Sequence, residues 1–266
     1  MNSNIKVAFI GCGNMGSALA LSAAKSGCSL MLADPDSAKA ESLAKATGGV
    51  VATNEECAQN AQYIFMAVKP QIIGAVLKDM APTLAKRDDR FLLVSMAAGV
   101  KIKTIHNHLG FDCPAIRIMP NTPASIGSGV ILYCSEGATV QEEEEFCNLM
   151  QNAGVVDNLA EKLIDSASAL SGCGPAFVYQ FIEALADGAV DAGLPRDKAL
   201  LYAELTVAGA ANLALQSGEH PGKLKDAVCS PGGSTIEGVR ALEAGAFRSS
   251  VIEAVIASYN RTKELG

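Results

Sequence analysis

A glycine-rich turn near the N-terminus joins an apolar, β-branched stretch to a helix of small residues. The stretch covers residues 5–10, and the helix begins near Asn14. This order of strand, glycine turn and helix is the one that a dinucleotide-binding βαβ unit requires. Gly11 would permit the tight turn, Gly13 would let a pyrophosphate approach the backbone, and Gly16 would let the helix pack closely on the strand. The helix N-terminus would offer free N–H groups to the phosphates. The alternative is an ordinary strand-turn-helix with incidental glycines.

An acidic residue follows the second predicted strand, residues 29–33. Asp34 comes roughly 20 residues after the glycine turn, where the dinucleotide fingerprint places the group that faces the adenosine ribose. A carboxylate there suits a free 2′-hydroxyl and repels a 2′-phosphate, so Asp34 favours NADH over NADPH. Asp34 and Asp36 could instead cap the helix predicted over residues 37–46.

Strands and helices continue to alternate through the first half of the chain. Strands are predicted over residues 48–52, 63–68, 91–95, 115–119, 130–134 and 155–156, and helices from residue 54 and over 71–80, 102–109 and 139–153. Ligands bind at the carboxyl edge of such open α/β sheets. Two loops at that edge are therefore candidate cofactor contacts. Ala67–Pro70 contains Lys69, which could approach a ribose or phosphate, and Ala97–Gly99 is small enough for a nicotinamide ring to pack nearby.

Helices without intervening strands follow from about residue 160. Pro175 and two neighbouring glycines interrupt the first long segment, and residues 196–216 form a helix that is apolar or small on nearly every side. Such a helix must be buried, and a helical domain of this size offers little to bury it against. We therefore predict an obligate homodimer. The fold class is α/β, with a Rossmann-type dinucleotide-binding domain over residues 1–159 and an all-helical dimerisation domain over residues 160–266.

Composition and charge narrow the possible partners. The formal net charge of −7 argues against nucleic acid, and no apolar stretch is long enough to cross a bilayer. The eight cysteines form no Cys-x-x-Cys pair, and no histidine has metal-ligand spacing with a cysteine, so no metal is expected. The row Glu183, Asp187 and Asp191 could suggest a carboxylate site, but we interpret it as a polar helix face. Without a signal-peptide layout before the first strand, we expect a cytoplasmic protein that acts on a small molecule.

Two loops are rich in turn residues and polar groups. Pro120–Ala124 has two prolines that bracket Asn and Thr, which predicts a rigid, functional loop. Ser230–Thr235, with the sequence Ser-Pro-Gly-Gly-Ser-Thr, presents several N–H groups and hydroxyls at the start of a helix, an arrangement that suits a carboxylate. A helix-capping turn is the alternative for the second loop.

Taken together, these stretches closely resemble the pyrroline-5-carboxylate reductase family, whose members catalyse the last step of proline synthesis. The matching stretches run in family order across almost the whole chain: Gly11–Gly16, Ala67–Pro70, Ala97–Gly99, Arg117–Ala124, Leu170–Ala176, His220–Lys225 and Ser230–Ile236. The resemblance implies a helical dimerisation domain, active sites completed by the partner's helices, and dimers that often gather into decamers.

The resemblance also implies roles for individual residues. Those implied to bind the cofactor, NADPH or NADH, are Gly11, Cys12, Gly13, Asn14, Met15, Gly16, Asp34, Asn54, Ala67, Val68, Lys69, Pro70, Ala97, Ala98 and Gly99. Those implied to bind the substrate are Glu161, Val228, Gly232, Gly233, Ser234 and Thr235. Two departures from the family pattern are the acid at Asp34, where NADPH-using relatives often carry a small neutral or basic neighbourhood, and Cys173, where a serine is common.

The implied reaction is hydride transfer from the reduced nicotinamide to the C=N carbon of 1-pyrroline-5-carboxylate, which gives L-proline. No His, Lys or Asp falls within Ser230–Thr235, so Thr235 is the candidate catalytic hydroxyl, hydrogen-bonded to the ring nitrogen. A β-hydroxyacid dehydrogenase is a rival, but such enzymes carry a catalytic lysine where this chain has Val178. A non-catalytic dinucleotide-binding protein is a second rival, against which the polar loop Ser230–Thr235 argues.

Overall fold

The computed structural model describes residues 5–265 and divides the chain into two compact units. The first unit runs up to Cys173 and includes the segment from Ser258 onward, and the second is Gly174–Ala257. The division by contacts therefore falls later than the predicted boundary after residue 159, because the helix that begins at Glu161 packs on the sheet of the first unit. The boundary at 159/160 stays a prediction.

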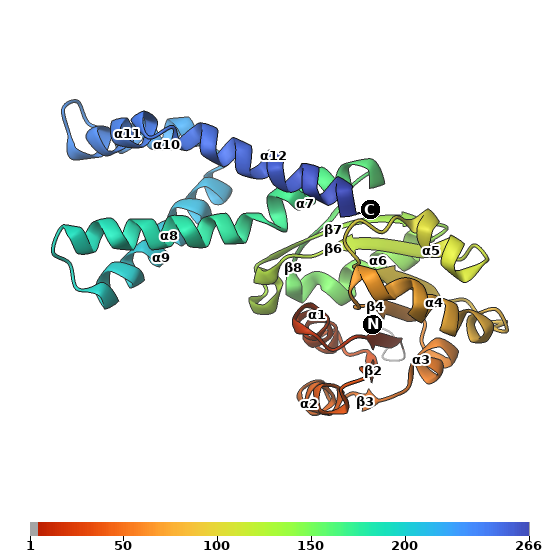
Figure 1. Cartoon of the computed structure of the whole chain (residues 1–266). Helices are drawn as coiled ribbons and strands as arrows, with labels where there is room; N and C mark the ends of the chain where they lie inside the picture. The colour runs from red at the N-terminus through yellow and green to blue at the C-terminus, as the bar shows by residue number, and fades with distance from the viewer. Residues whose placement is uncertain (1–4, 266) are drawn as a thin grey trace. The chain divides into compact units, whose positions relative to one another are not determined.

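The first unit is built on one eight-stranded sheet in the order β3-β2-β1-β4-β5-β6-β7-β8 (Figure 1). The strands are β1 Lys6–Ile10, β2 Ser29–Ala33, β3 Val50–Val51, β4 Tyr63–Met66, β5 Leu92–Ser95, β6 Ala115–Met119, β7 Gly129–Glu136 and β8 Gly154–Asn158. Neighbouring strands are parallel except for the antiparallel pair β6–β7. The first six strands have the Rossmann order, with the switch point between β1 and β4. The predicted fold class is confirmed.

Helices cover both faces of this sheet because alternate strand residues point to opposite sides. One face carries α1 Asn14–Ala24, α2 Ser37–Thr47 and α6 Val140–Met150, and Phe9 stacks there on Phe65 with ring centroids 4.4 Å apart. The other face carries α3 Asn54–Asn60, α4 Pro70–Leu84, α5 Ile102–Leu109 and α7 Glu161–Ser171. Two short 3-10 helices, Thr122–Ile126 and Gln151–Ala153, precede β7 and β8 in sequence. The helix predicted over residues 139–153 is thus an α-helix up to Met150 and a 3-10 helix over Gln151–Ala153.

The second unit is entirely helical in the described chain. It contains α8 Gly174–Asp191, α9 Arg196–Ser217, α10 Pro221–Ala227, α11 Ser234–Ala244 and the first part of α12 Phe247–Leu265. The helices α8 and α9 pack against each other around Ala186, Ala199 and Ala203. Phe181 of α8 lies 5.7 Å from Phe247 of α12, measured between ring centroids. The predicted break near Pro175 is confirmed, since α7 ends at Ser171 and α8 begins at Gly174.

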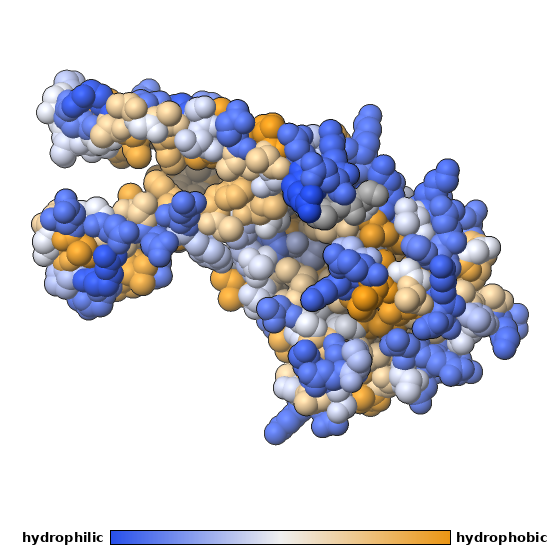
Figure 2. Space-filling view, in the orientation of Figure 1, coloured by the Kyte–Doolittle hydropathy of each residue, from blue (hydrophilic) through white to orange (hydrophobic). Residues whose placement is uncertain are grey.

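Large apolar side chains remain exposed on the helices of the second unit. Leu205, Leu213 and Leu215 of α9 are 61%, 58% and 81% exposed, and Figure 2 shows apolar residues along the surface of these helices. Of the 22 residues of α9, just Ala199 and Ala203 are buried within a single chain. A second protein surface is therefore needed to cover α9, as the sequence predicted. Among the described helices, none has the combination of length and apolarity that a membrane crossing requires.

Candidate functional site

Geometry requires glycine at two of the three positions in the turn after β1. Gly11 has φ +105°, and a Cβ there would lie 2.4 Å from the carbonyl oxygen of Ala67. A Cβ on Gly16 would lie 2.2 Å from the carbonyl oxygen of Gly11. Gly13 is different, because a Cβ there would meet nothing within 4 Å. Neither the backbone conformation of Gly13 nor its neighbours in the protein therefore require a glycine there. The absence of a side chain at Gly13 instead lets a ligand approach the backbone closely.

The helix α1 begins at this turn with free backbone donors. Gly13 occupies the N-cap position without a side-chain cap, and Asn14 and Met15 are the first helical residues. Orphan N–H groups and the helix dipole make such an end suitable for a phosphate. Beside it, a cavity of about 420 Å³ is lined by Cys12, Ser17, Leu21, Ala38, Lys39, Ser42, Leu43 and Ala46. The residues present therefore fit a dinucleotide, with the pyrophosphate at the helix end.

Both carboxylate oxygens of Asp34 accept hydrogen bonds from the backbone. The N–H of Cys12 donates to Oδ2 at 2.7 Å, and the N–H of Asp36 donates to Oδ1 at 2.9 Å. Asp34 is therefore fixed against the glycine turn and does not cap α2. Asp36 is the N-cap residue of α2, but its side chain accepts no hydrogen bond from the helix and pairs instead with Lys39 at 3.3 Å. Burial, and next the Asp34 charge, raise the pKa of the Cys12 thiol to about 11.

The other predicted cofactor loops lie at the carboxyl ends of neighbouring strands. Ala67 and Val68 directly follow β4, and the Ala67 N–H donates to the carbonyl of Ile10 on β1 at 2.8 Å. Lys69 and Pro70 begin α4, with Lys69 as the exposed N-cap residue. Asn54 is the exposed first residue of α3, which Thr53 caps through a capping box with Glu56. The structure thus brings these residues to one edge of the sheet.

The third predicted loop, Ala97, Ala98 and Gly99, connects β5 to α5. Gly99 has φ +75°, and the Val100 N–H donates to the Ala97 carbonyl at 3.2 Å. The loop is half-buried to buried, as a small-residue loop over a sheet edge should be. Its far end is held by Glu161, whose Oε1 accepts a hydrogen bond from the Ile102 N–H at 2.9 Å.

Arg117 begins the matching stretch Arg117–Ala124, but sequence reasoning gave it no role of its own. It is 0% exposed in the middle of β6, where Nη2 donates to Oδ1 of Asp165 at 2.5 Å and Nη1 lies 3.7 Å from Oε1 of Glu161. The available signal was a single charge inside the apolar strand Ala115–Met119. A cation within a buried strand needs an anionic partner, and the first turns of α7 provide two carboxylates.

The loop Pro120–Ala124, predicted to be rigid and functional, is anchored through the side chain of Asn121, and its functional role stays a prediction. The Asn121 side chain donates to the Ser171 carbonyl and accepts from the Val130 N–H, both at 2.9 Å. Residues 122–126 form a 3-10 helix rather than an irregular loop. Asn121 therefore connects β6 to β7 and to the end of α7.

The predicted substrate residues other than Glu161 lie in the second unit. Val228 is 64% exposed at the C-cap of α10, and Gly232 has φ +67°. Gly233 is the N-cap of α11 without a side-chain cap, and the exposed Ser234 and Thr235 are its first residues. The N-terminus of α11 thus presents free N–H groups next to two hydroxyls, a combination that can bind a carboxylate.

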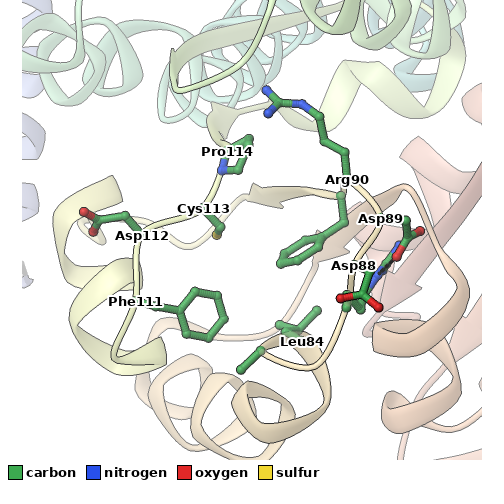
Figure 3. Close-up of a pocket in the computed structure, with 11 residues that line it drawn as sticks. Leu84, Asp88, Asp89, Arg90, Phe111, Asp112, Cys113 and Pro114 are labelled. Carbon is green, nitrogen blue, oxygen red and sulfur yellow. Dashed lines mark hydrogen bonds and ion pairs between the residues drawn. The ribbon is translucent and has the colours of Figure 1, made fainter.

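A cavity of about 540 Å³ lies elsewhere, near the amino-terminal ends of β5 and β6 (Figure 3). No predicted site residue lines it. Its Arg87 is engaged by Asp89 and by the carbonyls of Ala58 and Ala61, and its Arg90 is engaged by Glu142. Because this cavity is at the amino-terminal ends of the strands, it lies at the edge of the sheet opposite to the one where open α/β proteins bind ligands. Among the described residues, no group of three His, Cys, Asp or Glu could hold a metal ion, and Asp187 of the acidic row pairs with Arg196 at 2.5 Å.

Known proteins resemble the chain along its whole length. Residues 161–265 match the family model described as pyrroline-5-carboxylate reductase dimerisation, and residues 6–99 match the model described as NADP oxidoreductase, coenzyme F420-dependent. A pyrroline-5-carboxylate reductase of Pisum sativum is 39% identical over 270 residues, 100% of this chain and 97% of the relative. One of Escherichia coli K12 is 40% identical over 98% of each chain. The crystal structure of a Plasmodium falciparum pyrroline carboxylate reductase with NADP bound has a TM-score of 0.87 and 34% identity, over 98% of each chain.

Proposed function

The chain belongs to the pyrroline-5-carboxylate reductase family, and we propose that it reduces 1-pyrroline-5-carboxylate to L-proline with a reduced nicotinamide cofactor, as the last step of proline biosynthesis. One observation carries this proposal: the same chain has both the glycine turn Gly11–Gly16 and, at Ser230–Thr235, a start of α11 without a side-chain cap, and it matches family members over their full length. The first feature fits a dinucleotide and the second fits a small carboxylate. A dinucleotide-binding protein without catalysis would have no use for the second feature.

The cofactor is assigned to the carboxyl edge of the Rossmann sheet. The pyrophosphate binds to the backbone of the turn and the start of α1, formed by Gly11, Cys12, Gly13, Asn14, Met15 and Gly16. The adenosine ribose faces Asp34 and Asn54. The rest of the cofactor is bordered by the loops Ala67–Pro70 and Ala97–Gly99. The open space at Gly13 and the free N–H groups of α1 support the first assignment. The small residues of Ala97–Gly99 support the placement of the nicotinamide.

The substrate is assigned to the loop before α11. The N–H groups of Gly232, Ser234 and Thr235 hold the substrate carboxylate, with Val228 packed against the ring. Gly233 lies between them, and its own N–H donates to the Ser230 carbonyl at 3.0 Å and shapes the loop. When bound, the reduced nicotinamide supplies a hydride to the C=N carbon. The ring nitrogen must carry a proton to become an amine, and no acidic side chain lies between Ser230 and Thr235, so the proton arrives on the substrate or through water. The Thr235 hydroxyl is the catalytic group that hydrogen-bonds this nitrogen, and orientation supplies most of the rate enhancement.

Cofactor choice follows from Asp34. Its carboxylate is held by two backbone donors, so it cannot easily swing away from a 2′-phosphate. Lys39, the cation that lines the neighbouring cavity, is already paired with Asp36. A 2′-phosphate would therefore meet two carboxylates and one neutralised cation, which favours NADH over NADPH.

The assembly and the compartment are proposed on separate grounds. The chain self-associates through its dimerisation domain, and we extend this to dimers that gather into decamers on the resemblance alone. The eight cysteines are all free thiols, which fits the reducing conditions of the cytoplasm. Light scattering coupled to size-exclusion chromatography would distinguish a dimer from a decamer.

Initial-rate kinetics on the purified chain test the reaction. Oxidation of NADH and NADPH is followed with and without 1-pyrroline-5-carboxylate, and substrate-dependent turnover is expected with kcat/KM higher for NADH. Thr235→Ala should lower kcat/KM about tenfold or more, the loss of one hydrogen bond to a charged ring nitrogen, whereas Thr235→Ser keeps the hydroxyl and should retain most activity. Absence of turnover with either cofactor would exclude the reductase assignment.

Asp34→Asn tests the cofactor preference separately from the reaction. The asparagine oxygen can still accept from the Cys12 N–H, so the turn keeps its support while the negative charge is lost. The ratio of kcat/KM for NADH to that for NADPH should fall about tenfold. Asp36→Asn serves as the matched control and should change the ratio less. An unchanged ratio in Asp34→Asn would remove Asp34 from the determinants of specificity.

A further inference from the structure

Glu161 is the first residue of α7, yet its hydrogen bond goes to the first residue of another helix. Oε1 accepts from the N–H of Ile102 at 2.9 Å. This N–H has no partner within α5, because the first N–H groups of a helix are always left over. Lys101, the N-cap residue of α5, supplies no side-chain cap. Glu161 therefore acts as the missing cap of α5, and it does so at the point where the loop of residues 96–101 ends.

Arg117 fixes Glu161 in this position from below. Its Nη1 lies 3.7 Å from Oε1 of Glu161, and its Nη2 donates to Asp165, one turn further along α7. The guanidinium is completely buried, and neither Nε nor Nη1 has a hydrogen-bond partner in the described structure. A buried cation with unused donors is expensive unless anions neutralise it. The two carboxylates of α7 do so, and in return Arg117 holds the Glu161 side chain beside the end of the loop.

The same arginine lies next to the start of the loop. Arg117 of β6 is paired in register with Ser95, the last residue of β5. The hydroxyl of Ser95 accepts from the Ala97 N–H at 3.4 Å. Both ends of the loop, Ser95 and Ile102, are therefore tied to the cluster of Arg117, Glu161 and Asp165. Between them, the Met96 N–H donates to the Met66 carbonyl of β4 at 3.4 Å, and the Val100 N–H donates to the Ala97 carbonyl at 3.2 Å.

We propose that Glu161, anchored by Arg117, is a positioning residue that sets the loop of residues 96–101 against the nicotinamide end of the cofactor. Glu161 acts through the Ile102 N–H and the loop, so this role differs from the substrate contact that the resemblance implies. The proposal rests on the assignment of Ala97–Gly99 to the nicotinamide. It predicts that the cluster affects the nicotinamide half of the dinucleotide and leaves the adenosine half alone.

The test compares two ligands that differ in the nicotinamide. Dissociation constants of NADH and of ADP-ribose, which has the pyrophosphate and adenosine but no nicotinamide, are measured by calorimetry on the full chain. Glu161→Ala should weaken NADH about fivefold, the effect of losing one helix-cap hydrogen bond, and should leave ADP-ribose within about twofold. Glu161→Gln can still accept from the Ile102 N–H and should recover most of the NADH affinity. Lys162→Ala, at the next and exposed position, is the matched control and should change neither.

Glu161→Asp keeps the charge beside Arg117 but shortens the side chain by one methylene, so it replaces the alanine variant if that variant does not fold. Equal weakening of NADH and ADP-ribose in either variant would indicate a general structural role and overturn the proposal, as would unchanged NADH binding. The comparison does not depend on turnover. A chain that binds NADH but does not reduce 1-pyrroline-5-carboxylate would fail the proposed function while this test still gives an answer.

Discussion

At the scale of single residues, Gly11 and Gly13 are expected to respond differently to the same substitution. Gly11→Ala forces a side chain onto a backbone with φ +105° and to within 2.4 Å of the Ala67 carbonyl oxygen. The free energy of unfolding should fall by about 2 kcal/mol or more. Gly13→Ala meets open space at an ordinary φ of −73°, so the melting temperature should hardly change while NADH binding weakens.

Thermal melting without cofactor and titration with NADH separate the two effects. The contrast depends on Gly13 being kept for the ligand and Gly11 for the fold. If Gly13→Ala bound NADH as tightly as the unmodified chain, the pyrophosphate would not approach the backbone at Gly13, and the cofactor would have to be placed elsewhere along the turn.

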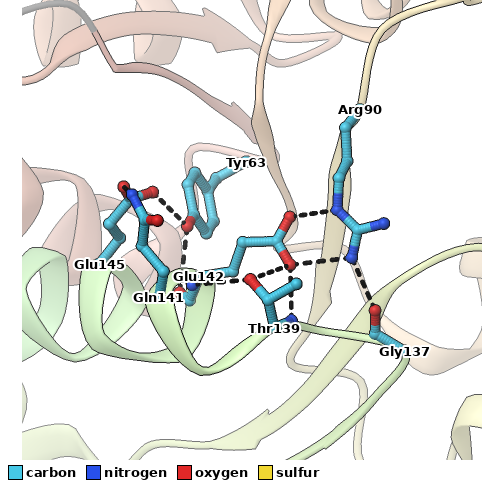
Figure 4. Close-up of polar contacts among 7 residues, drawn as sticks. All are labelled: Tyr63, Arg90, Gly137, Thr139, Gln141, Glu142 and Glu145. Carbon is cyan, nitrogen blue, oxygen red and sulfur yellow. Dashed lines mark hydrogen bonds and ion pairs between the residues drawn. The ribbon is translucent and has the colours of Figure 1, made fainter.

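A pH-dependent contribution to stability comes from Glu142, whose carboxylate lies between Arg90 and Thr139 (Figure 4). The hydrogen bond from Arg90 and, after the opposing effect of burial, those from Thr139 hold the pKa of Glu142 below its ordinary value of 4.5. The carboxylate is therefore preferred in the folded state. Its stabilisation is complete above pH 4.5 and is lost as the pH falls through the lowered, folded-state pKa.

Glu142→Gln should accordingly lower the free energy of unfolding at pH 7 by about 1 kcal/mol, a modest value because the Arg90 side chain is half exposed and screened by solvent. The difference from the unmodified chain should shrink at pH 3. Urea unfolding at both pH values measures this, with Glu144→Gln on the exposed side of α6 as control. A deficit that is equally large at pH 3 would mean that shape, and not charge, is responsible.

The residues that sequence reasoning identified share one property: each serves a local motif. Gly11, Gly13 and Gly16 form a contiguous turn, and Asp34 lies at a fixed distance after it. Sequence reasoning gave Arg117 no role and gave Glu161 a contact with the substrate. These two residues are 44 positions apart in sequence, and they meet only because α7 packs on the sheet. A charged residue in a buried strand indicates that an oppositely charged partner exists, but the sequence does not show which carboxylate is that partner.

At the scale of elements, the strand pair β7–β8 begins at a backbone contact so close that it requires glycine at Gly154. Gly154 begins β8 with φ +141°, and a Cβ there would lie 2.0 Å from the carbonyl oxygen of Gly129, its partner on β7. Gly154→Ala should displace the start of β8 and lower the free energy of unfolding by about 2 kcal/mol. Urea unfolding measures the loss, and Val155→Thr, 67% exposed at the next position, should cost far less. Comparable effects from the two variants would contradict the argument.

Periodicity predicted most of these elements, and the differences have physical causes. The strands of the parallel sheet are buried on both faces, so they stand out as short apolar runs. The helix α4 runs to Leu84 although the predicted helix stops at Met80, because Pro82 is accommodated inside the helix. Residues 120–124 were predicted as a rigid loop, but a 3-10 helix over 122–126 includes most of them, next to Asn121 and its partners on β7 and α7. Such contacts between distant elements leave no periodic signal.

At the scale of the whole molecule, the second unit does not bury enough of its own apolar surface. In addition to the exposed residues of α9, Val251, Ile252 and Ile256 of α12 are 42%, 59% and 47% exposed. Leu201, Leu205, Gly209 and Leu213 recur every four residues and share one face of α9. Burying one leucine is worth about 1.5–3 kcal/mol, so a second copy that covers this face gains far more than an isolated chain can.

A charge on that face should therefore dissociate the dimer. Leu205→Glu would bury a carboxylate without a partner in both subunits, and the dimer dissociation constant should rise about a hundredfold or more. Light scattering coupled to size-exclusion chromatography over a range of concentrations reports the mass, and far-UV circular dichroism checks that the helices persist. Glu204→Gln, an equally large charge change at the neighbouring exposed position on the same helix, is the control and should leave the mass unchanged. If Leu205→Glu keeps the mass of the unmodified chain, then this face of α9 lies outside the dimer interface, and the exposed residues of α12 become the surface that self-association must cover.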